Sequence, residues 1–181
     1  MKSIIIIVIS CSCLFTGCNS KPSLQKYYVE KTENKDFIAL DVSPTILNID
    51  QQKLTFEQKD ALKSFDKMNI LAFKLNDSNQ AQFEVERIKI KEILKDEKYQ
   101  ELMKFGRGKE GGSVSFVGDD NNIEEVVVFA NKDDAGFAVV RILGKDMNPT
   151  DVMNMISLIQ QSKINMDQLK PLQEMMTQSK N

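Results

Sequence analysis

The pattern of apolar and polar positions divides the chain into short segments that are typical of helices or of strands. Residues 24–33 are expected to form a short helix, and the apolar run from Phe37 to Val42 is typical of a strand. The strand is predicted to stop at Ser43-Pro44, because proline cannot donate a ladder hydrogen bond. Residues 69–75 predict the next strand.

A helix is predicted between these two strands. Thr55 and Gln58 form a T-x-x-Q capping box, which is typical of a helix N-terminus. Four apolar residues then share one helical face: Phe56, Ala61, Leu62 and Phe65.

Residues 79–105 carry two competing patterns. Their apolar residues partly alternate, but the interleaved charges and the lack of glycine and proline favour a long helix. A second helix is expected to begin at Asp96, with Tyr99, Leu102 and Met103 on its buried side.

Three β-rich runs follow, at residues 112–118, 123–130 and 136–143. The turn-forming clusters at 119–122 and 131–135 separate them. Such short connections predict an antiparallel meander.

The last predicted helix begins at Asn148-Pro149-Thr150-Asp151, with Asn as cap and Pro in the first turn. Its apolar stripe contains Val152, Met155, Ile156 and Ile159. Residues 163–181 are expected to form a polar C-terminal tail or a loosely docked helix.

These elements predict an α+β fold for residues 36–162. The expected architecture is a single mixed β-sheet of about five strands, with the last three in an antiparallel meander. The helices are expected on one face of the sheet, where all the apolar stripes would be buried.

The first 17 residues have the layout of a secretory signal. A charged start that contains Lys2 precedes an apolar run from Ile4, and small residues end it at Gly17-Cys18. The run from Ile4 to Phe15 is shorter than the roughly 20 residues of a spanning helix. A cleaved signal peptide at residues 1–17 is therefore expected.

The segment Leu14-Phe15-Thr16-Gly17-Cys18 resembles the lipobox of bacterial lipoproteins. This resemblance implies cleavage after Gly17 and lipid attachment at Cys18, and a membrane anchor follows from it. Residues 18–35 would then comprise the lipidated cysteine, a tether and a possible short helix. The alternative of a metal site at the three cysteines would need ligands from elsewhere, since the chain has no histidine.

Composition narrows the function further. The chain holds 24 basic and 26 acidic residues, a net charge of −2 with mixed signs, so no nucleic-acid partner is expected. Without histidine, and without a thiol other than Cys18 after cleavage, the usual catalytic triads are excluded. We expect no enzyme, no cofactor and no metal, although a carboxylate-based hydrolase stays a formal alternative.

Three motifs suggest other chemistry. The segment 106–113 is a near miss to a phosphate-binding loop, but Gly112 replaces the lysine and a connector is favoured. The acidic turns near Asp119 and Asp133 could each hold calcium weakly, although exposed hairpin turns are the simpler interpretation. Methionines in the last part of the chain could bind Cu(I), but packing or contact roles are more common.

Four segments resemble a family of Bacteroidetes-type lipoproteins that bear the "domain of unknown function 4252". They are Tyr99 to Met103, Ser113 to Phe116, Val126 to Val128, and Phe137 to Val140. The resemblance implies an exported α+β domain and carries no catalytic residues.

The sequence thus favours a lipid-anchored protein of the cell envelope, acting as a non-enzymatic protein-interaction or sensing module with an envelope protein as partner. Asn19-Ser20-Lys21 lacks the acidic run of surface-displayed lipoproteins, so the outer membrane facing the periplasm is the expected location. The alternative is a carrier or binding protein for a small apolar ligand.

Overall fold

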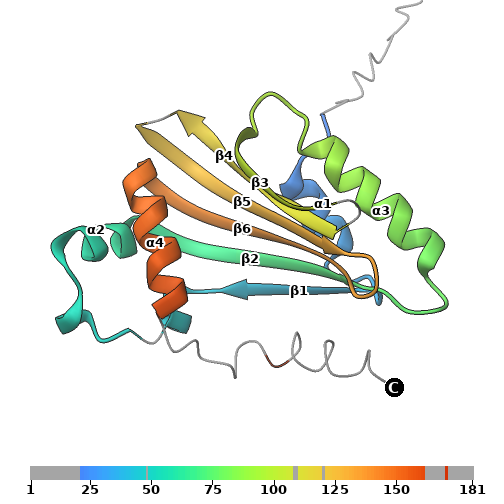
Figure 1. Cartoon of the computed structure of the whole chain (residues 1–181), viewed down its shortest axis with the longest axis horizontal. Coiled ribbons are helices and arrows are strands. Elements are labelled where there is room, and N and C mark those ends of the chain that lie inside the picture. Colours follow the sequence, from blue (N-terminus) through green and yellow to red (C-terminus); the bar gives the residue numbers. More distant parts are fainter. Residues whose placement is uncertain (1–20, 48, 108–109, 120, 162–169, 171–181) are drawn as a thin grey trace, which may run out of the picture.

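Six strands form one open antiparallel sheet in the order β1-β2-β6-β5-β4-β3 (Figure 1). The computed structural model describes residues 21–47, 49–107, 110–119, 121–161 and 170. The strands are β1 (Phe37–Val42), β2 (Phe65–Lys74), β3 (Gln100–Arg107), β4 (Glu110–Asp119), β5 (Asn122–Lys132) and β6 (Gly136–Met147).

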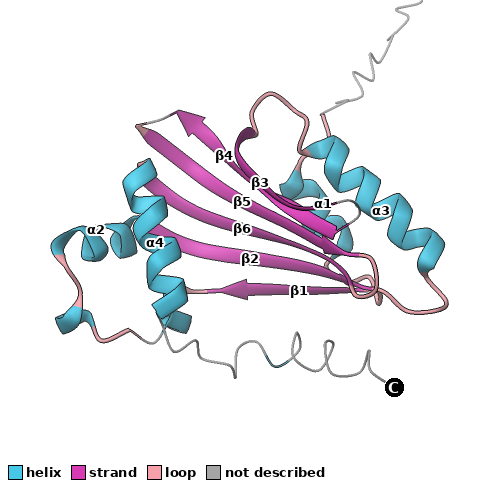
Figure 2. Cartoon of the chain, viewed as in Figure 1, coloured by secondary structure: helices cyan, strands magenta, loops and turns pink. Residues whose placement is uncertain are grey.

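Four α-helices and two short 3-10 turns complete the described part of the chain (Figure 2). The helices are α1 (Leu24–Lys31), α2 (Phe56–Ser64), α3 (Gln80–Ile93) and α4 (Pro149–Gln161), and the turns are η1 (Pro44–Leu47) and η2 (Gln51–Lys53). Figure 1 shows α4 in front of the strands and α1 behind them.

The sheet buries side chains on both faces, because successive residues of a strand point to opposite sides. On one face, α1 and α3 cover an aromatic core that includes Phe73, Phe83 and Phe137. On the other face, Val152 and Met155 of α4 pack on residues of the central strands, such as Ile142. The helices therefore lie on two faces of the sheet.

The α+β class, the single sheet and the antiparallel meander of the last strands are confirmed. The details differ in three respects: the sheet has six strands rather than five, it is antiparallel throughout rather than mixed, and its helices cover both faces. Two-sided coverage follows from strands such as β5, in which the neighbours Val126 and Val127 point to opposite faces and both are buried.

The second helix predicted from Asp96 is wrong. Tyr99 is buried as expected, but β3 begins at the next residue, and Leu102 and Met103 are 49% and 56% exposed. The expected face of the helix at 56–64 also needs correction, because Phe56 is exposed and Phe65 is the first residue of β2.

Several predictions fall outside the described residues. These are the signal peptide at 1–17 with Gly17, the lipid-bearing Cys18, and the tail or helix at 163–181, of which Lys170 alone is described. Within the described residues, no helix has the length and apolar character needed to cross a membrane.

Candidate functional site

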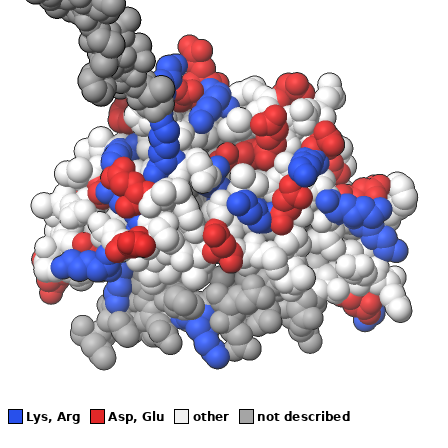
Figure 3. All heavy atoms as spheres, turned by 180° about the vertical axis from the view of Figure 1, so that it is seen from behind, with Lys and Arg blue, Asp and Glu red and all other residues white. Residues whose placement is uncertain are grey.

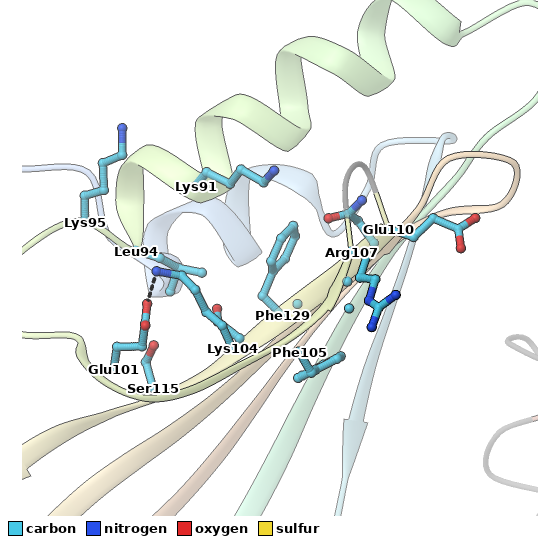
Figure 4. A pocket seen from close by; sticks show the side chains of 15 residues that line it. Lys91, Leu94, Lys95, Glu101, Lys104, Phe105, Arg107, Glu110, Ser115 and Phe129 are labelled. Atoms are coloured by element: carbon cyan, nitrogen blue, oxygen red, sulfur yellow. Dashed lines mark ion pairs between the residues drawn. The ribbon is translucent and has the colours of Figure 1, made fainter.

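The most distinctive concave surface is a groove of about 480 Å³ between the C-terminal half of α3 and the β3–β4 hairpin (Figure 4). Leu94 and Phe129 supply its apolar wall, and Ser113 and Ser115 of β4 line its floor. Phe129 rises from the sheet toward α3.

Charged side chains line this groove, and more of them are basic than acidic. Lys91 lies in the last turn of α3, Lys95 follows just after the end of that helix, and Lys104 reaches toward α3 from β3 (Figure 4). The full set of charged lining residues is Lys91, Lys95, Lys104 and Arg107 against Glu101 and Glu110. On the face opposite to that of Figure 1, acidic and basic residues are interspersed (Figure 3).

The rim of the groove is the edge strand β3, whose eight residues are all exposed. Leu102, Met103 and Phe105 are 49%, 56% and 46% exposed, which is unusual for large apolar side chains in a strand. The other edge strand, β1, is mostly buried or half-buried. The two edges of the sheet therefore present very different surfaces.

Glycines allow the β3–β4 hairpin to close tightly. Gly106, with φ +92°, lies opposite Gly111, and a Cβ on Gly106 would be 2.3 Å from the Gly111 Cα. A Cβ on Gly112 would lie 2.0 Å from the Phe129 carbonyl oxygen and 2.7 Å from the Phe105 ring. The described residues of the segment predicted as a connector, 106–107 and 110–113, instead belong to two paired strands.

Two buried contacts hold α3 and the start of β3 in place. Glu86 of α3 accepts hydrogen bonds from Tyr27 Oη and Lys31 Nζ of α1, both at 2.7 Å. Burial, and then the hydrogen bond to Glu86, raise the pKa of Tyr27 well above its usual value. Tyr99 Oη accepts a hydrogen bond from the Leu24 backbone N–H at 3.2 Å.

A second network, centred on the buried Arg141, joins α1 to the sheet. Arg141 of β6, which is 5% exposed, donates to both carboxylate oxygens of Glu125 at 2.7 and 3.0 Å and to Gln25 at 2.6 Å. Asp41 accepts hydrogen bonds from Asn69 and, at 3.1 Å, from Tyr28. The network fixes α1, which in turn holds α3 above the groove.

The Tyr28 hydroxyl makes the stability of the fold decrease at alkaline pH. Burial, and then the hydrogen bond to Asp41, raise the pKa of Tyr28 to about 12, whereas tyrosine in an unfolded chain ionises near pH 10. Tyr28 thus contributes stability that is complete below about pH 10 and lost as the pH rises to about 12.

Tyr28→Phe tests this contribution by urea denaturation between pH 9 and about pH 12. We expect the free energy of unfolding to fall more steeply with pH in the wild type than in Tyr28→Phe. The same dependence on pH in both proteins would contradict this role of Tyr28.

The glycine-rich segment, the acidic turns and the methionines singled out in the sequence lie at different places in the fold. Segment 106–113 lies at the groove, whereas Asp119 and Asp133 lie beyond opposite ends of β5. No group of three or more His, Cys, Asp or Glu side chains that could hold a metal ion occurs within the described ranges. Met153 is 65% exposed and Met155 is buried, so these two point to different sides of α4.

The groove was not predicted as a site from the sequence. Its cations come from α3 and from β3, and β3 was predicted as a helix. Leu102 and Met103 follow Tyr99 at helical spacing, so the local pattern gave no sign of the edge strand that forms the rim of the groove.

Residues 27–155 match the model of a family described as "Domain of unknown function (DUF4252)". The match covers α1 from Tyr27, the whole sheet and the first half of α4. No curated protein and no solved structure matches the chain.

Proposed function

Because the chain belongs to the DUF4252 family, whose description assigns no activity, we propose a function from the geometry: a non-enzymatic protein-interaction module. Its contact surface is the β3 edge together with the adjoining groove. The single observation that carries the proposal is the exposed apolar row Leu102, Met103 and Phe105 on an edge strand. Exposed apolar edges are liabilities unless they serve association.

We place this module in the cell envelope, attached to the membrane by lipid on Cys18 and facing the periplasm from the outer membrane. The support is the lipobox-like segment that ends in Gly17-Cys18, behind a short apolar run. A tether then precedes α1, which begins at Leu24. The interaction surface would thus be held near the membrane by a short linker.

Carriage of a small apolar ligand is the less favoured alternative. The space between the sheet and α3 is occupied by packed rings, with Phe73 5.5 Å from Phe137 and 5.9 Å from Phe83 between ring centroids. The groove itself is open to solvent and flanked by charges (Figure 4). These features suit a protein partner better than an apolar molecule.

Site-specific photo-crosslinking in intact cells tests the interaction role. A photo-reactive amino acid replaces Leu102, and the matched control replaces Met153, which is exposed on α4. We expect a discrete adduct at Leu102 but not at Met153, and a weaker adduct when Cys18→Ala removes the anchor. Equal labelling at both positions, or no adduct at Leu102, would exclude β3 as the contact surface.

A further inference from the structure

The β3 edge offers a continuous stretch for one more strand. Among the strands that the structure describes, β3 is the terminal one of the sheet and pairs only with β4. A bulge between Glu101 and Met103 interrupts its register, but Met103 to Arg107 pairs regularly with β4. An extended segment can therefore add along Met103 to Arg107 by backbone hydrogen bonds.

The two sides of this stretch differ in chemistry. Met103 and Phe105 lie opposite Val114 and Gly112, on the sheet face that α4 covers. Lys104 lies opposite Ser113, on the face of α3 and the groove (Figure 4). A strand added here places alternate side chains beside apolar groups on one face and beside cations on the other.

The cations on the groove side are available to a partner. No ion pair of Lys91 occurs among the described residues, and Lys91 extends along the groove. Lys95 pairs with Glu92 and Lys104 with Glu101, at 2.6 Å each, but these side chains are 46–73% exposed. Ion pairs this exposed contribute little energy, so each lysine can leave its glutamate for a better placed carboxylate of a partner.

From this arrangement we propose that β3 takes up an extended segment of a partner protein with alternating acidic and apolar side chains, as a seventh strand. The acidic side chains would face Lys91, Lys95 and Lys104, and the apolar ones would continue the row of Met103 and Phe105. This inference rests on the proposed interaction function and names the chemistry of its partner.

The charges favour this occupant over the chain itself. Antiparallel pairing of two copies centred on Lys104 would place Lys104 against its own copy, with the lysines of both α3 helices flanking the junction. The chain's own residues 162–181 carry more basic than acidic side chains. An acidic segment of another protein supplies the negative charge that neither a second copy nor residues 162–181 would bring to these lysines.

Binding of defined peptides to the full chain in detergent tests the proposal. The probe is a labelled Glu-Val-Glu-Val-Glu-Val-Glu peptide, compared with its Lys-Val counterpart and with an N-methylated Glu-Val form that cannot pair. We expect only the first to bind by fluorescence anisotropy, and to protect the amides of Met103 to Arg107 from hydrogen exchange. Binding of the Lys-Val or N-methylated peptide with equal affinity would overturn the proposal.

Matched charge reversals locate the binding. Lys91→Glu/Lys95→Glu is expected to lower the affinity for the acidic peptide by about tenfold. Lys59→Glu/Lys63→Glu, with the same spacing on α2, should leave that affinity unchanged. Equal effects of the two variants would contradict the assignment to the groove. Peptide-independent dimerisation that Lys104→Glu alters would instead identify a second copy as the occupant and overturn the proposal.

The crosslinking experiment separates the two levels of inference. An adduct at Leu102 without any binding of the acidic peptide would overturn the acidic-strand proposal and leave the interaction function standing. Absence of the Leu102 adduct would remove the interaction function itself.

Discussion

Arg141→Ala is expected to lower the free energy of unfolding by about 3–5 kcal/mol. The substitution removes the partner of Glu125, whose side chain is 14% exposed, and leaves its carboxylate poorly solvated. It also removes the hydrogen bonds that Arg141 donates to Gln25 and Asn69, which join α1 to β6 and β2. The loss should be visible as a lower urea midpoint with a similar slope.

Two comparisons make the Arg141 experiment specific. Arg107→Ala removes an exposed arginine and should change stability by no more than about 0.5 kcal/mol. Arg141→Met/Glu125→Met removes both charges, and it should recover most of the lost stability because no buried charge is left without a partner. A loss below about 1 kcal/mol for Arg141→Ala would mean that solvent reaches Glu125 and that the network does little to hold α1.

Phe73→Ala is expected to lower the free energy of unfolding by about 3–5 kcal/mol through the cavity that it creates. Phe73 is fully buried at the centre of the aromatic core, with ring centroids 5.0 Å from Phe37 and 5.5 Å from Phe137. Because these rings come from three strands, the surroundings cannot collapse into the space without moving the sheet.

The control for this experiment is Phe56→Ala, since Phe56 is 73% exposed and a loss within about 0.5 kcal/mol is expected. Urea denaturation followed by circular dichroism suits both variants because the chain has no tryptophan. Similar losses for the two phenylalanines would contradict the assignment of Phe73 to the centre of the core.

Local patterns predicted the elements whose signals lie close together in sequence. The capping box of Thr55 and Gln58 forms as expected, with both reciprocal hydrogen bonds. Asn148 and Asp151 likewise exchange hydrogen bonds at the start of α4. In such cases the residues that determine the structure are also neighbours in the chain.

The strand β3 was beyond these patterns because an edge strand exposed on both sides has no need of alternation. Its apolar residues Leu102 and Met103 follow Tyr99 at helical spacing, and a bulge disturbs the period of two. The candidate site was missed for the same reason, since its rim is this strand. The network around Arg141 joins residues up to 116 positions apart, which local periodicity does not report.

The strand order also determines when the sheet can close during synthesis. β6 ends at Met147, and it lies between β2 and β5, which no other strand connects. Until the ribosome has added β6, the earlier strands can form only two separate pieces, β1–β2 and β3–β4–β5, each with an unpaired apolar border. The apolar borders of β2 and β5 therefore stay exposed to intermolecular pairing until the segment that ends at Met147 has been synthesised.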